Sequence, residues 1–295
     1  MVKGKRRNGW ERAFDIANVL FLGTIGLLAL FPFAYVLSLS LSSAADVQRG
    51  SLNLVPSHPS FDAYRILFKN PDLATGLLNS IVRTALGTAM TLLATCVAAY
   101  PLAQKTLPHR SLYIRLILFT MLFSGGIVPT FLLVRGLGMI DTVWALVVPG
   151  MLTGFNVLLV KNFFEALPVS LSESASVEGA GPWTVLFRIY IPLSAPVLAT
   201  VGLWMAVAHW NGWFDALLYI NDDRKQPLQT FLQRVVIENS SMLTDIGGGS
   251  VAPGGFTPET VKAATVVITI LPMILIYPFV QRFFTKGILL GGVKE

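Results

Sequence analysis

The chain has 295 residues, of which 54% are hydrophobic and 13% are charged, and its mean hydropathy is +0.65. A soluble domain carries about 25% charged residues, so this composition excludes an ordinary soluble protein and predicts an integral membrane protein. The net charge of +6 does not indicate a nucleic-acid partner, because the basic residues form no cluster on a polar domain. The one cysteine, Cys96, excludes an intramolecular disulfide and gives no support to a thiolate metal site.

Six runs without Asp, Glu, Lys or Arg are candidates for membrane-spanning helices, which need about 20 apolar residues. They cover residues 16–45, 84–104, 116–134, 142–160, 189–214 and 263–281. The first run follows basic residues, as a signal peptide does, but it is far longer than the roughly 7 to 15 residues of a signal h-region. We therefore predict an uncleaved anchor and a multi-pass protein with six transmembrane helices.

The basic residues predict that both termini lie in the cytoplasm. Five lysines and arginines precede the first run, and only Arg49 lies close behind it, so the amino terminus is expected to stay inside. Six spans return the carboxyl terminus to the same side. The predicted organisation is a cytoplasmic segment 1–13, a membrane domain 14–285 and a cytoplasmic tail 286–295.

This topology gives long outer loops over residues 43–77 and 221–259, and a polar inner loop over residues 165–192. Long outer loops fit a surface that meets another protein. The Gly-rich part of the second loop fits a disordered connector equally well, and both interpretations stay open.

The inner loop is predicted to form two short helices. Ser170 and Glu173 have the spacing of a capping box, so the first helix is expected to begin near Leu171. The run Glu178-Gly179-Ala180-Gly181 is expected to end it, because glycine readily adopts the left-handed conformation that closes a helix. Pro182 suits the first position of the second helix.

The second helix of the inner loop has an apolar stripe at helical spacing, formed by Trp183, Leu186, Phe187 and Tyr190. The loop as a whole carries acids that cannot lie in hydrocarbon, so it is expected at the inner membrane face. Lipid headgroups are one possible contact. An anionic leaflet would prefer lysines to acids, so a protein partner with basic groups is favoured.

The inner loop resembles the signature cytoplasmic loop of the permease subunits of binding-protein-dependent ABC importers. The matching positions are Glu173, Ala175, Gly179, Ala180, Phe187, Ile189, Pro192, Leu193 and Pro196. Ser174 and Glu178 depart from the commoner alanine and aspartate but keep size or charge. Asn79-Ser80, Trp210-Asn211 and the tail Lys286–Lys294 are similar to the carbohydrate-uptake branch, in particular to the second permease of a maltose-type importer. Permeases for plant or algal polysaccharides, such as the alginate-oligosaccharide importer, are the nearest likeness.

The resemblance implies an all-α integral membrane protein with a type I ABC importer permease fold and cytoplasmic coupling helices. It implies a location in the bacterial inner membrane, with a second permease, two ATPase subunits that bind ATP and Mg, a solute-binding protein and an oligosaccharide substrate as partners. The chain has no Gly-x-x-x-x-Gly-Lys-Ser/Thr loop, so it is expected not to be an enzyme. The residues implied in ATPase coupling are Glu173, Ala175, Glu178, Gly179, Ala180, Gly181, Trp183, Phe187 and Pro192.

The fifth run ends in the chain's candidate pathway residues, Trp210, Asn211 and Trp213. Aromatic rings stack on the C–H faces of sugars and an amide bonds hydroxyl groups. An aromatic belt at the outer interface is the alternative, and it is favoured for Trp213. His209 is interpreted as a hydrogen-bonded helix-packing residue and not as a proton relay, and Arg83 is expected to snorkel to the outer interface.

Two other classes of protein fit the sequence less well. An intramembrane enzyme needs converging catalytic groups or metal ligands, but the chain has only three histidines, and the topology puts His58 and His109 on opposite sides of the membrane. Half of an ion-coupled secondary transporter is the stronger alternative. It predicts buried acids within the spans, which the six runs do not supply. It also leaves unexplained the glycine elbow, the predicted bend at Gly179 and Gly181 between the two short helices of the inner loop.

Overall fold

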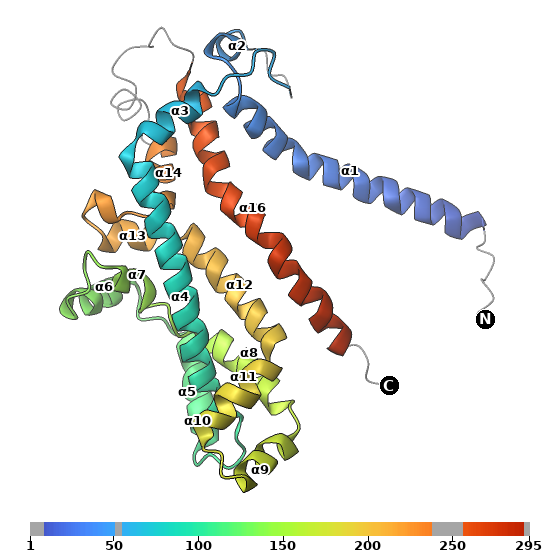
Figure 1. Cartoon of the computed structure of the whole chain (residues 1–295), viewed down its shortest axis with the longest axis vertical. Helices are drawn as coiled ribbons and strands as arrows, with labels where there is room; N and C mark the ends of the chain where they lie inside the picture. Colours follow the sequence, from blue (N-terminus) through green and yellow to red (C-terminus); the bar gives the residue numbers. More distant parts are fainter. Residues whose placement is uncertain (1–8, 51–54, 238–255, 292–295) are drawn as a thin grey trace. The chain divides into compact units, whose positions relative to one another are not determined.

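The computed structural model describes residues 9–50, 55–237 and 256–291, and these ranges form helices without a β-sheet (Figure 1). The contacts divide the chain into two compact units. One unit comprises residues 1–69 and 238–268, and the other comprises residues 70–237 and 269–295. The long last helix, α16 (Pro258–Gly291), contributes to both.

The first unit contains α1 (Gly9–Ser40), α2 (Ala44–Gln48), α3 (Asp62–Lys69) and the beginning of α16. Its α1 has 32 residues and is therefore about 48 Å long. In the most apolar 18-residue window of α1, no residue is buried by the rest of the chain. This exposure is expected of a helix that faces lipid or another subunit.

A short polar segment of the first unit is held together by Asp46. Its carboxylate accepts a hydrogen bond from the backbone of His58 at 3.0 Å and lies 3.1 Å from the His58 ring nitrogen Nδ1. The hydrogen bond with the His58 side chain lowers the pKa of Asp46. The contact therefore ties α2 to the segment that leads into α3.

The second unit is built around α4 (Pro71–Ala103), which Asn70 caps and Pro71 begins. The helices that pack on it most extensively are α12 (Ala195–Asn211), α8 (Gly154–Glu165) and α14 (Leu228–Ile237). The remaining elements are α5 (Arg110–Leu122), α6 (Ile127–Gly136), α7 (Val143–Val147), α9 (Val169–Val177), α10 (Pro182–Val185), the π-helical turn Leu186–Tyr190, α11 (Ile191–Leu193), α13 (Phe214–Tyr219) and the 3₁₀ turn Asp223–Lys225.

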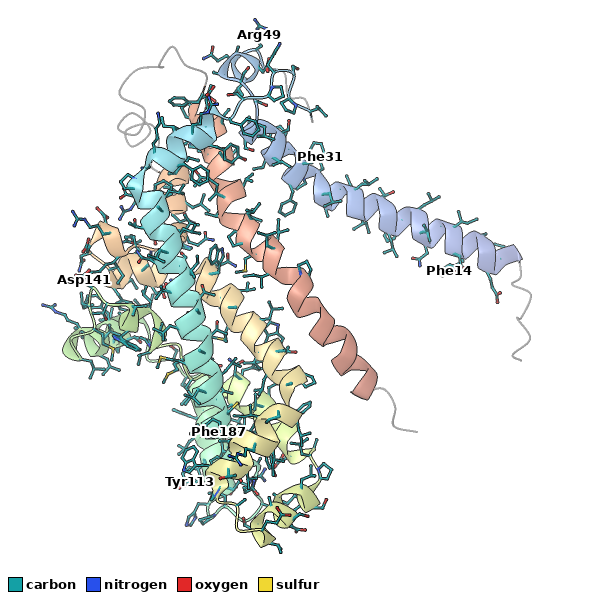
Figure 2. All side chains as sticks on the ribbon, viewed as in Figure 1. Phe14, Phe31, Arg49, Tyr113, Asp141 and Phe187 are labelled. Carbon is teal, nitrogen blue, oxygen red and sulfur yellow. The ribbon has the colours of Figure 1, made fainter. Side chains whose placement is uncertain are left out.

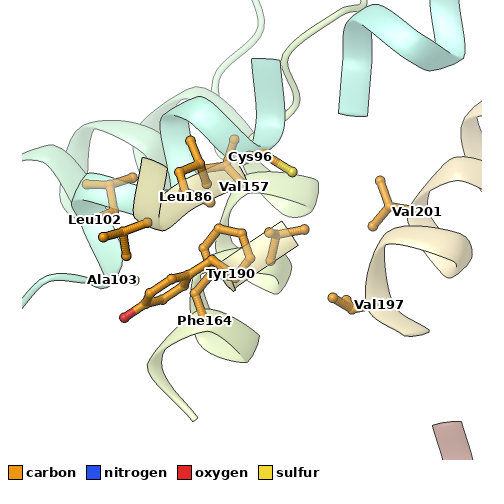
Figure 3. Close-up of a cluster of buried hydrophobic side chains, with 12 residues drawn as sticks. Cys96, Leu102, Ala103, Val157, Phe164, Leu186, Tyr190, Val197 and Val201 are labelled. Atoms are coloured by element: carbon orange, nitrogen blue, oxygen red, sulfur yellow. The ribbon is translucent and has the colours of Figure 1, made fainter. Parts of the chain in front are cut away.

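The main apolar cluster of the second unit joins the end of α4 to α8, to the π-helical turn and to α12 (Figure 3). Tyr190 lies at its centre. Its ring meets Tyr100 and Phe164 edge to face, with centroid distances of 5.1 Å and 5.3 Å. Leu186 and Val201 are also fully buried here. The 165–192 loop is packed against the rest of the second unit through this cluster, to which its Leu186 and Tyr190 belong.

Among the described residues, three helices are long and apolar enough to cross a membrane, namely α1, α4 and α16 over Pro258–Ile276. The bent pairs α5–α6 (112°) and α10–α12 (82°) raise the number to as many as five if each pair counts as one span. The expectation that residues 142–160 form one continuous helix is wrong, because α7 and α8 are separated around Pro149 and Gly150. Proline removes a helix donor and glycine weakens a helix interior.

Several predicted boundaries lie within helices. The expected outer loop 43–77 contains α2 and α3, and the first part of the expected loop 221–259 contains α14. The Gly-rich stretches of that loop fall in 238–255, outside the described residues. The tail predicted from residue 286 begins inside α16, which continues to Gly291, and residues 1–8 and 292–295 are also outside the described ranges.

Candidate coupling surface and polar cavity

The first helix of the inner loop, α9, is exposed on nearly all sides, and none of its residues is buried. It begins at Val169 with Pro168 at the N-cap position and has no side-chain cap. The predicted capping box at Ser170 is therefore wrong, because Ser170 already lies within the helix. Glu173 is exposed on this helix.

The predicted glycine elbow is confirmed. Gly179 has a φ of +81°, the Ala180 amide donates to the Ala175 carbonyl at 2.9 Å, and the Gly179 amide donates to Ser176 at 3.0 Å. This pair of bonds is the Schellman motif that closes a helix. Gly181 then forms the N-cap of α10, and Pro182 begins that helix, as predicted.

The predicted apolar stripe divides into an inner and an outer part. Leu186 and Tyr190 are buried in the cluster of Figure 3. Trp183 and Phe187 are 62% and 45% exposed, and their rings stack with centroids 6.2 Å apart; Figure 2 labels Phe187 on its turn. Large aromatic side chains are normally buried in the protein that carries them. The exposure of these two rings therefore indicates a surface that a partner covers.

The remaining predicted coupling residues lie on both sides of the elbow. Ala175 and Ala180 are half-buried and pack against the apolar cluster. Glu178 and Pro192 are exposed. We call the exposed set Glu173, Glu178, Trp183 and Phe187 the loop face. It combines two acids with two stacked aromatic rings, and the alanines anchor it to the cluster beneath.

A polar network fixes the start of the loop. Glu165 at the end of α8 pairs with Arg110 of α5 and, at 2.7 Å, with Lys161. Arg110 also donates from Nε to the Leu102 carbonyl at 2.7 Å. Three helices therefore meet where the loop begins. The Lys161–Glu165 part is readable from its i,i+4 spacing, whereas the Arg110 contact joins distant parts of the sequence.

The three candidate pathway residues have different surroundings. Trp210 is 3% exposed and its indole Nε1 donates to the Thr269 carbonyl of α16 at 3.0 Å. Asn211 is exposed and accepts from Gln229 at 3.4 Å. Trp213 is half-buried and meets the Phe214 ring edge to face at 5.7 Å. Their role in a pathway stays a prediction.

The expectation that Arg83 snorkels is wrong. Arg83 is 3% exposed, donates from Nη1 to the Gly212 carbonyl at 2.7 Å and pairs through Nη2 with Asp215. The end of α12 leaves the Gly212 carbonyl without a helical partner, and a cation is favourable at the carboxyl end of a helix. A charge inside an apolar helix is the signal that could have pointed to this pair.

Two glycines admit the large polar side chains between α4 and α12. A Cβ on Gly212 would overlap the Arg83 guanidinium, and a Cβ on Gly87 would lie 2.5 Å from Nε2 of His209. His209 is buried against Gly87, which agrees with packing between helices. The predicted hydrogen bond is not found at its Nε2, which has no partner among the described residues. α4 carries Arg83 and Gly87, and α12 carries His209 with Gly212 directly after its last residue. Each side thus has one glycine and one polar side chain that fit those of the other.

A cavity of about 360 Å³ lies beside the Arg83–Asp215 pair, and we call it the Arg83 cavity. Arg83, His209 and Asp215 line it together with apolar residues of α7 and α12 and with Tyr219 of α13. None of the three candidate pathway residues lines it. Its volume is in the range of about 300–1,000 Å³ that is typical of small-molecule pockets.

Asp141 joins the turn before α7 to the segment after α13. It has a φ of +60°, and its carboxylate accepts from the Asn221 and Asp222 amides at 2.5 Å and 3.0 Å and from the Asn221 side chain at 3.1 Å (Figure 2). These hydrogen bonds, that of the Asn221 side chain first, lower the pKa of Asp141. The contact is therefore present at neutral pH and is lost only as the pH falls through the lowered pKa.

Comparison with known proteins identifies the family. Residues 98–289 match the family model of the binding-protein-dependent transport system inner membrane component. The chain belongs to this family. The predicted resemblance to importer permeases and the predicted all-α type I permease fold are therefore confirmed. A transport component of this family is not an enzyme.

Relatives of this inner membrane component cover almost the whole chain. Protein LplC of Bacillus subtilis is 42% identical over 96% of this chain and 95% of its own length. The polygalacturonan/rhamnogalacturonan transport system permease protein YtcP of the same organism is 40% identical over 96% of this chain and 99% of its own length. The second name agrees with the predicted carbohydrate-uptake branch.

One solved structure is closely similar to this inner membrane component. It is a chain of a bacterial ABC transporter involved in the import of the acidic polysaccharide alginate. It has a TM-score of 0.89 and 33% identity, and the match covers 95% of this chain and 99% of that one. A second structure, of the alginate transporter in complex with a pentasaccharide-bound periplasmic protein, has a TM-score of 0.53 and 15% identity and shows the fold alone.

Proposed function

We propose that this chain is one of two permease subunits of an ATP-driven importer that moves an oligosaccharide from a solute-binding protein into the cytoplasm. Family membership over residues 98–289 carries this conclusion. Relatives named for polygalacturonan and rhamnogalacturonan transport and for import of the acidic polysaccharide alginate favour an oligosaccharide that contains sugar acids. The substrate is delivered on the periplasmic or extracellular side of the membrane, and both termini of this chain lie in the cytoplasm of the bacterium.

The loop face is the proposed contact with the ATPase subunits, which bind ATP and Mg. Its exposed Trp183–Phe187 stack supports this role, because large aromatic side chains dominate the binding free energy at protein interfaces. The acids Glu173 and Glu178 suit basic or amide groups of a partner. The Schellman turn at Gly179 and the buried Leu186 and Tyr190 make the two helices a rigid lever, so that movement of the ATPases reaches the membrane helices.

Half of an ion-coupled carrier is not favoured. Asp215 is the first acid after the fifth apolar run, and it is paired with Arg83, so it is not a free ion-coupling group. Family membership and the exposed loop face both favour the ATP-driven importer.

The loop face can be tested by copurification of the ATPase subunits with the permease pair. Trp183→Ala and Phe187→Ala each remove an exposed ring, and loss of an interface hot spot costs about 2 kcal/mol or more, or about thirtyfold in affinity. We expect both variants, and Glu173→Ala to a lesser extent, to lose ATPase subunits while the second permease stays bound. Trp10→Ala, which removes an exposed ring of α1, is the matched control. Equal ATPase recovery from all variants would contradict the proposal.

A further inference from the structure

The Arg83 cavity contains polar groups whose hydrogen-bonding capacity is unmet. The Nε of Arg83 and the Nε2 of His209 are buried and have no hydrogen-bond partner in the part of the chain that the structure describes. Both side chains are more than nine-tenths buried. Buried polar groups in proteins are normally hydrogen-bonded, so these two nitrogens are unusual. Protein atoms cover both of them, and Nε2 of His209 lies against Gly87, so an occupant of the cavity meets the partly exposed carboxylate of Asp215 instead.

Asp215 is the polar group of the cavity that an occupant reaches most easily. Its side chain is 33% exposed, whereas that of Arg83 is 4% exposed. One carboxylate oxygen, Oδ2, accepts from Arg83, and the other, Oδ1, accepts from the Ala216 amide at 3.0 Å. Each carboxylate oxygen accepts more than one hydrogen bond, so Asp215 keeps acceptor capacity for a ligand.

The charges beside the cavity select the chemistry of that ligand. Arg83 and Asp215 carry opposite charges that cancel locally. A ligand carboxylate would meet Asp215 as a like charge, and a ligand cation would meet Arg83. A hydroxyl group avoids both conflicts, because it is uncharged and donates a hydrogen bond to a carboxylate. The apolar wall, with Leu146, Met205 and the Tyr219 ring, suits the C–H faces of a sugar.

We propose that the Arg83 cavity is a saccharide subsite that binds the hydroxyl groups of one sugar unit. Asp215 accepts hydrogen bonds from those hydroxyls, and Arg83 positions Asp215. The inference rests on the proposed function for its substrate class. It adds that this chain contributes a sugar contact of its own, and that this contact recognises hydroxyl groups and not the carboxylate of an acidic sugar.

Protection of an introduced thiol tests the subsite in the complete importer, purified with its partner subunits in lipid nanodiscs. The parent combines Cys96→Ser with Ala208→Cys, since Ala208 lines the cavity. The probes are trigalacturonate and the neutral trisaccharide made by reducing its carboxyl groups. At about ten times its Kd, either probe should slow alkylation by N-ethylmaleimide about tenfold.

Adding Asp215→Asn to the parent should weaken protection by both probes about tenfold or more, because a hydrogen bond to a charged group is lost. Asp223→Asn is the matched control, since Asp223 pairs with Arg234 at 2.7 Å outside the cavity. Gly150→Leu tests the cavity without touching the ion pair, because a Cβ there meets no atom within 4 Å. We expect it to remove the effect of both probes on alkylation.

Two results would overturn the subsite. One is that neither probe changes the alkylation rate of the parent, although the wild-type importer takes up labelled trigalacturonate. The other is protection by trigalacturonate alone that survives Asp215→Asn, which would indicate a carboxylate site. If the wild-type importer takes up neither saccharide, the failure lies in the proposed substrate class and not in the subsite, so the two failures are distinguishable.

Discussion

Gly212 shows how one small residue decides where a buried charge can lie. The Arg83 guanidinium occupies the space that a side chain at position 212 would take, and it donates to the carbonyl of the same residue. Arg83 is 3% exposed, so it has no room to move away without breaking its pair with Asp215. The buried ion pair therefore depends on a residue that has no side chain.

Gly212→Ala should destabilise the protein through this overlap. Overpacking of this kind costs about 1 to 3 kcal/mol, which corresponds to a melting temperature lower by a few degrees. Gly136→Ala is the matched control, because a Cβ at the end of α6 meets no atom within 4 Å. Thermal unfolding of the detergent-purified chain measures both variants. Equal melting temperatures would show that Arg83 moves without cost.

At the scale of elements, each part of the loop between α8 and α12 is held by a different local interaction. Glu165 anchors its start, the Schellman turn sets the elbow, and Tyr190 holds its end in the apolar cluster. The two glycines of the elbow have different roles. Only Gly179 has a positive φ, whereas Gly181 has a φ of −73° that any residue adopts.

Gly179→Ala and Gly181→Ala therefore form a matched pair. A left-handed alanine costs about 1–2 kcal/mol, so Gly179→Ala should speed hydrogen exchange of the α9 amides by about 5- to 30-fold. Gly181→Ala should leave exchange nearly unchanged, because a Cβ there meets no atom within 4 Å. Exchange measured by mass spectrometry on the purified chain gives both values. Similar exchange in the two variants would mean that the positive φ at Gly179 does not fix the elbow.

At the scale of the whole molecule, the proposed topology puts the loop face in the cytoplasm and the segment before α3 outside. Val177 is 89% exposed on the loop, and Val55 is 75% exposed before α3, so both positions are suited to introduced thiols. In a Cys96→Ser background, we expect the thiol of Val177→Cys to react with a membrane-impermeant maleimide only in inside-out vesicles. The thiol of Val55→Cys should react only in right-side-out vesicles. Labelling of both from one side would refute the topology.

The membrane class, the apolar helices and the two-helix inner loop could be predicted because they depend on short stretches of sequence. Hydropathy acts over about 20 residues, and the proline and glycine signals at Gly179 and Pro182 act over one turn. Predictions from local signals were wrong where one stretch of sequence allows more than one helix boundary. Ser170 has the spacing of a cap, but α9 begins before it. Residues 142–160 contain no charged residue, yet they divide into two helices around Pro149.

The sequence by itself determined what must be buried in a membrane and where the polar inner loop must lie, since both follow from composition and local pattern. Only the tertiary structure decided which side chains meet. Arg83 pairs with Asp215 across 132 positions of the chain, and Trp210 bonds a carbonyl 59 positions away. Such partners have no local signature, because the free energy of a buried polar group depends on what the fold brings beside it.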